Sequence, residues 1–229
     1  MKWISRTLLA LALTVAAVQP AAAQRSHERH FQWYWGGQGG AFYYQTAVQG
    51  YYFDPVMGGH WLITARKTAL YLAYEQAVFL ADAKGVIFDP ASSGCSVGSA
   101  CRDVTFGDMR RIMIGVLAFP LQKRFEPFMG AGFAMMQVLN PVVDCSTCNP
   151  AAPGEAFEAQ SRAEEASSKA FFWLMGGLQI SQGKMSLFGH YILTSAAKDF
   201  LIQGTTHSMQ AGLRYSFGTA KEGIGGERN

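Results

Sequence analysis

Residues 206–217 read THSMQAGLRYSF, and apolar side chains alternate with polar or small ones along this stretch. One set consists of Met209, Ala211, Leu213, Tyr215 and Phe217, and the other of Ser208, Gln210, Gly212, Arg214 and Ser216. A period of two places each set on its own face of a β-strand, whereas the 3.6-residue period of a helix would scatter both sets. The stretch therefore predicts a strand with one apolar face.

Similar alternation recurs along the chain after its N-terminal segment, in about eight stretches of roughly ten residues each. Strands are expected near residues 31–44, 58–66, 69–79, 109–118, 124–137, 170–181, 184–193 and 206–217. In residues 109–118, for example, Ile112 and Ile114 would face outward and Arg111 inward. Glycines interrupt the first and fifth stretches, which is typical of bends in a barrel wall and of inward positions where larger side chains would collide.

The composition indicates contact with lipid, because aromatic residues make up 13% of the chain and charged residues only 15%. Beyond the N-terminal segment no apolar run reaches the roughly 20 residues of a membrane-spanning helix, so a membrane protein of this sequence must be a β-barrel. Aromatic residues gather near both ends of the first expected strand: Trp33, Tyr34, Trp35, Tyr43, Tyr44, Tyr51 and Tyr52. They fit the aromatic girdles of a transmembrane barrel.

The expected connections alternate in length. Three are short, at residues 66–68, 119–123 and 182–184, and four are longer, at residues 45–56, 80–105, 138–168 and 194–204. Short periplasmic turns with long extracellular loops are characteristic of barrels in the bacterial outer membrane. We therefore predict an all-β fold, an eight-stranded antiparallel transmembrane β-barrel with up-and-down meander topology and both termini on the short-turn side.

The third long connection contains GEAFEAQSRAEEASSKA, residues 154–170, which is rich in helix-forming and acidic residues. Because this segment has no clear apolar stripe, a solvated acidic loop with a transient helix is favoured over a recognition helix. The chain shows no internal repeat of about 20–50 residues, which argues against solenoid and propeller folds.

Residues 1–23 have the pattern of a secretory signal peptide: Lys2 and Arg6 precede an apolar run at residues 8–18, and the segment ends in three alanines. The alternative, an uncleaved anchor, does not account for this A-x-A ending. Cleavage after Ala23 would leave 17 Lys and Arg against 16 Asp and Glu, so no nucleic-acid partner is expected. The predicted parts are a signal peptide at residues 1–23, a barrel at 24–217 and a disordered periplasmic tail at 218–229.

The segment QAGLRYSF, residues 210–217, resembles the final strand of bacterial outer-membrane β-barrel proteins. The assembly signal of that family corresponds here to Gln210, Gly212, Tyr215 and Phe217, although this chain continues for twelve residues beyond the last aromatic residue. The resemblance implies insertion into the outer membrane of a Gram-negative bacterium by the barrel-assembly machinery. In pattern, nearly the whole mature chain is similar to small eight-stranded surface-antigen barrels of the opacity type.

The four cysteines fall in two of the expected long loops: Cys95 and Cys101 in the second, and Cys145 and Cys148, within DCSTCNP, in the third. An even number of cysteines in an exported chain indicates two disulfides, and three pairings are open. A four-cysteine zinc site is disfavoured because the spacing of the first pair is wide. A redox centre is disfavoured because the C-x-x-C sequence does not open a helix in a βαβ unit.

Charged residues and a histidine would point into the barrel by the same alternation: Glu75, Arg111, Glu126, Lys184, His190 and Arg214. Eight strands enclose a space that side chains just fill. Since buried charges must be paired, a structural network of ion pairs and hydrogen bonds is favoured over a path for protons or solutes.

No enzymatic site is predicted. A lipid hydrolase needs a serine within hydrogen-bond reach of a histidine, but His190 and Ser195, like His207 and Ser208, would face opposite sides. Lipid A deacylases place these two residues two apart on one strand face, and that likeness fails here. We expect no cofactor and no metal, and a surface or structural protein whose loops contact lipopolysaccharide or an extracellular partner. The alternatives are a lipid-modifying enzyme, a narrow channel and a soluble lipocalin-like binder, which would need its apolar face inward.

Overall fold

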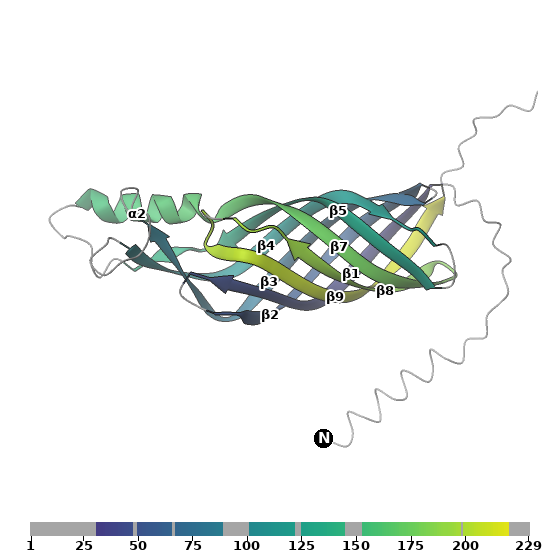
Figure 1. Ribbon diagram of the computed structural model, residues 1–229, viewed down its shortest axis with the longest axis horizontal. Coiled ribbons are helices and arrows are strands. Elements are labelled where there is room, and N and C mark those ends of the chain that lie inside the picture. The colour runs from purple at the N-terminus through teal and green to yellow at the C-terminus, as the bar shows by residue number, and fades with distance from the viewer. Residues whose placement is uncertain are drawn as a thin grey trace, which may run out of the picture.

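The computed structural model describes residues 31–47, 50–65, 67–88, 101–121, 125–144, 153–197 and 199–219. Eight long antiparallel strands in these ranges close into a barrel (Figure 1). They are β1 (Gln32–Thr46), β2 (Tyr52–Ala65), β3 (Thr68–Phe88), β4 (Cys101–Ala118), β5 (Phe125–Leu139), β7 (Ser168–Gln182), β8 (Met185–Thr194) and β9 (Ile202–Thr219). Each pairs with the next long strand along the chain, and β9 pairs with β1 to close the circle. The predicted fold, an eight-stranded antiparallel meander barrel, is confirmed.

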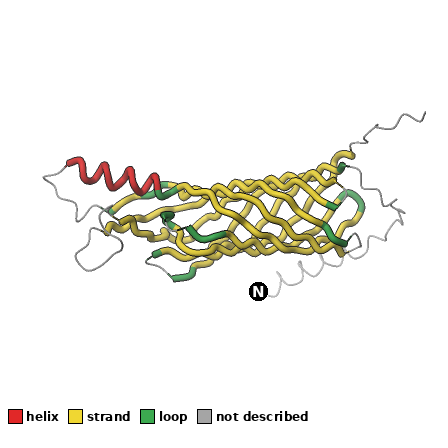
Figure 2. The backbone as a smooth tube through the Cα atoms, turned by 45° about the horizontal axis from the view of Figure 1, so that its top comes forward, coloured by secondary structure: helices red, strands yellow, loops and turns green. Residues whose placement is uncertain are grey.

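Connections of unequal length define the two ends of the barrel. The end that carries the connections at residues 66–67, 119–124 and 183–184 is called the turn end, and the first residue of β1 and the last of β9 lie there. The opposite end, called the loop end, carries the short strand β6 (Val142–Val143) and the helix α2 (Pro153–Glu165), which Figure 2 shows lying beyond the barrel wall. Within the described part of the chain, no helix has both the length and the apolar character that a membrane crossing requires.

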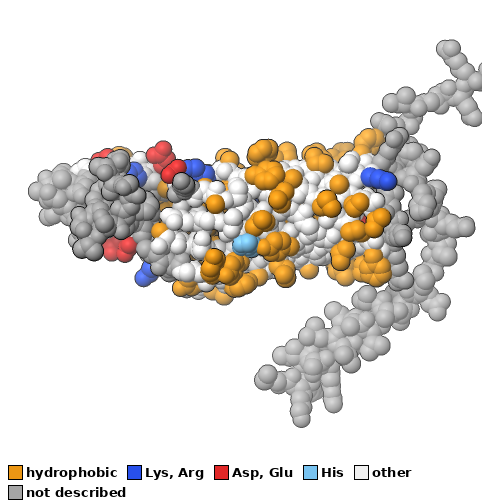
Figure 3. All heavy atoms as spheres, viewed as in Figure 1, with side chains coloured by type: hydrophobic (Ala, Val, Ile, Leu, Met, Phe, Trp, Pro, Cys, Tyr) orange, Lys and Arg blue, Asp and Glu red, His pale blue; other side chains and the backbone are white. Residues whose placement is uncertain are grey.

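Alternation along the strands separates an apolar outer wall from a mixed interior. On β9, Met209 and Leu213 are at least half exposed on the wall, whereas Gln210 and Arg214 are buried inside. The strands β8 and β4 show the same division, as their sequences predict. Apolar side chains spread over the wall, and charged ones gather mostly toward the loop end (Figure 3).

Aromatic clusters mark two levels on the wall. Near the turn end, the ring of Trp61 lies 5.2 Å from that of Trp33 and 5.8 Å from that of Trp35. Near the loop end, the ring of Tyr43 lies 4.8 Å from that of Tyr51 and 4.7 Å from that of Phe53. Ten residues separate Trp33 from Tyr43. At about 3.3 Å per residue and a tilt of roughly 40°, this spacing gives a band about 25 Å tall, the height of a transmembrane barrel's apolar belt.

Glycines on the inner face admit large side chains. Gly115 and Gly132 are direct cross-strand partners, and a Cβ atom on either would lie 2.3 or 2.8 Å from a ring carbon of Trp173. Trp173 is fully buried and donates its indole N–H to the carbonyl of Phe133 at 3.0 Å. The glycines that interrupt the alternation in the sequence therefore make room for the interior, as expected.

Three expected loops contain more regular structure than predicted, and in one of them, residues 80–105, β3 continues to Phe88 and β4 begins at Cys101. Residues 45–46 belong to β1 and residues 52–56 to β2. The buried carboxylate of Asp54 accepts a hydrogen bond from the Tyr44 hydroxyl at 3.0 Å, which links the two strands near the loop end.

The acidic segment forms α2, a defined helix whose Ala159 and Ala163 are buried against the barrel's loop-end core. The prediction of a solvated acidic loop with a transient helix is wrong for Ala159 and Ala163, which are buried, while Glu158, Glu164 and Glu165 are exposed as expected. Two small residues four apart suffice for docking and leave no clear apolar stripe in the sequence.

Candidate functional site

The interior of the barrel is where the sequence places its charged residues. Glu75, Arg111, Glu126, His190 and Arg214 are at most 4% exposed and lie inside the barrel. The prediction for Lys184 is wrong, since this residue occupies the turn between β7 and β8 and is exposed. The preceding Gly183 has φ of +62°, which places the turn at residues 183–184 and starts β8 one residue after Lys184.

The first charged layer is built around Glu75. Its carboxylate accepts hydrogen bonds from the Nε and Nη2 atoms of Arg111, the former at 3.1 Å, from Gln38 at 2.5 Å and from Gln210 at 3.0 Å. Arg111 also donates to the hydroxyl of Ser208 at 3.0 Å. Four strands thus contribute to one buried ion pair, so the layer ties together segments that are far apart in the sequence.

The second charged layer, nearer the turn end, is built around Arg214. Its Nε donates to Nε2 of His60 at 2.9 Å, and its Nη1 donates to the amide oxygen of Gln179 at 2.7 Å. The amide nitrogen of Gln179 donates to Glu126 at 2.6 Å, so an amide stands between the carboxylate and the guanidinium. Because Nε2 of His60 accepts, the imidazole proton must sit on Nδ1.

Aromatic rings complete the packing of the second layer. The guanidinium of Arg214 lies 4.0 Å from the ring centroid of Phe188 and 5.2 Å from that of Phe128. His190 stacks on Phe188 with 5.4 Å between ring centroids. Cation–π contacts of this kind stabilise a desolvated cation by about 2 kcal/mol. Arg214 is therefore in contact with aromatic rings and neutral polar groups, and Gln179 lies between it and the carboxylate of Glu126.

The two layers meet at Tyr71. Its hydroxyl lies 3.2 Å from the amide nitrogen and 3.4 Å from the amide oxygen of Gln38, and its ring lies 5.6 Å from that of His60. Polar side chains therefore follow one another from Glu126 to Ser208 along the lumen. Not every polar atom is satisfied: in the part of the chain that the structure describes, Nη1 of Arg111 and Nη2 of Arg214 have no hydrogen-bond partner.

An apolar cluster closes the loop end above the first charged layer. Its rings include those of Phe42, Tyr44, Phe79 and Phe106, which stack or meet edge to face with centroids 4.8–5.8 Å apart. The helix α2 and the segment at residues 200–202 pack onto the same cluster. The guanidinium of Arg111 lies 5.7 Å from the ring centroid of Phe42, so the apolar cap sits directly on the charged layer.

Residues of the proposed assembly signal occupy both faces of β9. Gln210 is inside the barrel, and Tyr215 and Phe217 are 48% exposed on the wall. A Cβ atom at Gly212 would lie 2.7 Å from the ring of the inward Phe188. The strand continues to Thr219, which pairs with Gln32, so the strand itself ends two residues beyond the predicted barrel boundary.

Several predicted features lie outside the described residues. They include the signal peptide, residues 220–229 of the tail, Cys95, Cys145 and Cys148. Cys101 begins β4, but its side chain also lies outside what is described. The disulfide prediction therefore stays a prediction.

The two serine–histidine pairs weighed from the sequence are separated by the barrel wall. His190 is buried inside, while Ser195 is exposed and its hydroxyl accepts the backbone N–H of Phe172 at 3.1 Å. Ser208 faces the lumen and bonds Arg111, while its neighbour His207 lies on the wall. Among the described residues, no cluster of three or more His, Cys, Asp or Glu side chains could hold a metal ion.

The sequence did not identify the neutral side chains that are hydrogen-bonded in the two layers. They are Gln38, His60, Tyr71, Gln179 and Gln210, the last of which donates to Glu75. Their inward placement follows from the alternation of side chains along a strand, and this alternation is clear in the sequence around Gln210 on β9. For Gln38 and His60 the adjacent glycines hide the alternation.

No family model matches the chain, and no curated protein matches it. Among solved structures, Neisserial surface protein A is similar over 81% of this chain and 97% of its own, with 12% identity and a TM-score of 0.51. The chain has the fold of a small outer-membrane β-barrel. Two further solved structures also match. OprG from Pseudomonas aeruginosa has 9% identity and a TM-score of 0.40, over 82% of this chain and 97% of its own. Ail of Yersinia pestis has 10% identity and a TM-score of 0.38, over 82% of this chain and 100% of its own.

Proposed function

We propose that this chain is a non-enzymatic, non-conducting barrel of the bacterial outer membrane that acts through its loop end at the cell surface. The observation that carries the proposal is the closed interior. Two charged layers fill the lumen, and the apolar cluster with α2 covers them at the loop end. A barrel with a filled interior has only its wall and its ends with which to contact other molecules.

The membrane assignment rests on the wall. Large apolar side chains are exposed around it, and aromatic clusters stand about 25 Å apart at its two ends. The expected signal peptide and the motif at Gln210, Gly212, Tyr215 and Phe217 support export and delivery to the outer membrane by the barrel-assembly machinery. The polar lumen and apolar wall are the reverse of a soluble lipocalin-like binder.

The loop end offers a folded surface for contacts. Phe157 on α2 is 79% exposed, and Glu158, Glu164 and Glu165 are exposed on the same helix. The helix is held in place by Gln160, which donates to the carbonyl of Pro141 at 2.8 Å and accepts from the N–H of Val143 at 3.3 Å. Lipopolysaccharide or an extracellular partner would meet this surface.

Cysteine labelling on whole cells tests the orientation. Ser161→Cys places a thiol on the exposed face of α2, and Lys184→Cys places one in the turn at the opposite end. A membrane-impermeant maleimide should label Ser161→Cys on intact cells and Lys184→Cys only after lysis. The reverse pattern, or equal labelling, would overturn the proposal that the loop end is at the surface.

A narrow channel is the second candidate, and the unpaired guanidinium nitrogens of Arg111 and Arg214 favour it, because they leave polar sites inside the lumen. Planar-bilayer recordings separate the two functions. A sealed barrel gives no stepwise conductance, whereas a channel gives steps that change when Phe42→Ser loosens the cap. Steps from the unmodified protein would replace our proposal with the channel.

A further inference from the structure

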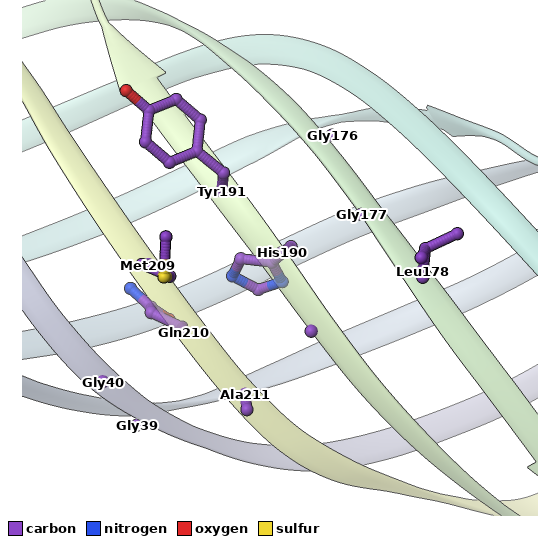
Figure 4. Close-up of a pocket in the computed structure, with 11 residues that line it drawn as sticks. Gly39, Gly40, Gly176, Gly177, Leu178, His190, Tyr191, Met209, Gln210 and Ala211 are labelled. Atoms are coloured by element: carbon purple, nitrogen blue, oxygen red, sulfur yellow. The ribbon is translucent and has the colours of Figure 1, made fainter.

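A shallow apolar groove crosses the outer wall over β1, β9, β8 and β7. Figure 4 shows the residues that line it. Its volume is about 570 Å³. Its floor follows from the strand register, because Gly39 pairs with Ala211 and Ala211 pairs with Gly189. Gly176 extends the floor onto β7. A Cβ atom at Gly176 would meet nothing within 4 Å, and one at Gly189 would meet only a backbone oxygen at 3.8 Å, so the outward space there is open.

Larger side chains form the rim of the groove. Met209, Leu178 and Tyr191 are 68%, 59% and 43% exposed and stand beside the small floor residues. On β4, by contrast, the outward row carries the larger side chains of Ile112, Ile114 and Val116, which are 48–55% exposed. The groove is therefore not repeated on β4.

The groove lies within the apolar belt. Gly39 on its floor is four residues from Trp35 of the turn-end aromatic cluster and four from Tyr43 of the loop-end cluster. Among the described residues, no acidic, lysine or arginine side chain lines it; His190 and Gln210 belong to the inner face of the same strands. Because the groove is continuous with the membrane-facing wall, its surroundings in a bilayer are hydrocarbon chains.

A polar cluster stands at the loop-end edge of the groove. The ring of Tyr191 lines the groove, and its hydroxyl contacts Nδ1 of His207; Nε2 of His207 lies 3.4 Å from the Thr205 hydroxyl. His207 is the next outward residue after Met209 on β9 and pairs with Tyr43 across the strands. In Figure 3 a histidine side chain is visible among apolar ones on this wall. These polar groups face outward at the level of the loop-end aromatic cluster, outside the lumen network.

We propose that this wall binds one acyl chain of an outer-leaflet lipid. The methylene chain lies in the groove, and the ester or amide that links it to the headgroup meets Tyr191, His207 and Thr205. An apolar trough with hydroxyl and imidazole groups at one end matches the polarity of an acylated lipid, whose long apolar chain ends in a polar linkage. The site rests on the proposed function, because it meets the outer leaflet only if the barrel spans the membrane with its loop end at the surface, and it is independent of what the loop end contacts.

Photocrosslinking of the full chain in vesicles tests the site. The probe is phosphatidylethanolamine with a mid-chain diazirine, at a low fraction in unlabelled phosphatidylethanolamine and phosphatidylglycerol, and crosslinked peptides are mapped by mass spectrometry. Crosslinks should concentrate on β1, β7, β8 and β9. Gly176→Leu should lower their yield about tenfold by filling the groove, the loss of roughly two buried methylene groups.

A matched control uses Gly59→Leu. Gly59 also faces outward, and a Cβ atom there would meet only a backbone oxygen at 3.5 Å, but it lies on β2 outside the groove, so crosslinking should be unchanged. His207→Phe keeps an aromatic ring and removes both ring nitrogens. It should lower the preference for ester-linked over ether-linked probe, because only the hydroxyls of Tyr191 and Thr205 remain at that end, while leaving the chain in the groove.

Three outcomes would overturn the lipid site. Crosslinks spread evenly around the wall, or equal effects of Gly176→Leu and Gly59→Leu, would mean a non-specific lipid annulus. Crosslinked dimers in place of lipid adducts would assign the groove to a second copy. A chain that fails to insert into the vesicles would overturn both the site and the membrane function, so the two failures are distinguishable.

Discussion

The two charged layers of the lumen neutralise their carboxylates in different ways. In the layer nearer the loop end, Glu75 contacts the guanidinium of Arg111 directly and accepts from two glutamines. In the layer nearer the turn end, Gln179 is hydrogen-bonded to both Glu126 and Arg214, and the guanidinium of Arg214 packs on the ring of Phe188. In the first layer the carboxylate and the guanidinium are in direct contact, and in the second a neutral amide lies between them. The consequences of losing a charge should therefore differ between them.

The largest effect should follow from Arg111→Leu. It leaves the Glu75 carboxylate, 1% exposed, without its cation, and removing one partner of a buried pair costs about 3–5 kcal/mol. Urea unfolding in lipid vesicles, followed by tryptophan fluorescence, measures the loss. The double variant with Glu75→Leu removes the stranded charge and should recover at least half of it. A double variant as unstable as Arg111→Leu would mean that packing, and not charge, dominates this layer.

A smaller loss is expected from Arg214→Met. The substitution removes hydrogen bonds to His60 and Gln179 and the contact with Phe188, but no carboxylate loses a direct partner. The expected cost is about 2–3 kcal/mol in the same unfolding measurement. Arg214→Lys keeps a charge but cannot reproduce the two-sided guanidinium geometry, so it should recover only part of the loss. A cost equal to that of Arg111→Leu would show that Glu126 relies on Arg214 as strongly as Glu75 relies on Arg111.

The role of backbone space in the second layer is tested by Gly36→Ala. A Cβ atom at Gly36 would lie 2.3 Å from the His60 ring and 2.8 Å from the carbonyl oxygen of Leu213, so the His60 ring, which accepts from Arg214, must shift. Overpacking of this kind costs about 1–3 kcal/mol. Gly37→Ala is the matched control, because a Cβ atom there faces outward and meets nothing within 4 Å. Equal stabilities of Gly36→Ala and Gly37→Ala would show that a Cβ atom at Gly36 does not disturb the second layer.

The fold was predictable because a strand's period of two is a local property. Residues 206–217 show it without a break, and the inward positions of Arg111 and Arg214 follow directly from it. A period of two also identifies which charges must find partners inside. It does not identify the partner, because Glu75 and Gln210 meet only after the barrel has closed.

The parts that could not be predicted depend on contacts across the closed barrel. The docking of α2 requires Ala159 and Ala163 to meet a core built from several strands. The inward face of His60 is hidden in the sequence by two preceding glycines, and the lipid-facing groove needs the register of four strands. Each of these features involves residues that are small or neutral, and such residues carry little signal on their own.

The smallest effect should come from Lys184→Ala, at the residue whose placement the sequence suggested wrongly. An inward lysine in the second layer would be a buried cation near Arg214, and its removal would relieve repulsion or strand a partner. In the structure Lys184 is exposed in a turn, and its main-chain carbonyl accepts the N–H of Ser216 at 2.7 Å, a bond that alanine retains. The stability should therefore change by less than about 0.5 kcal/mol. Lys184→Pro is the contrasting variant, because proline would constrain the turn beside Gly183, whose φ is +62°. A change above about 1 kcal/mol in Lys184→Ala would return this side chain to the lumen and make the second layer a cationic cluster in place of a carboxylate and a guanidinium with an amide between them.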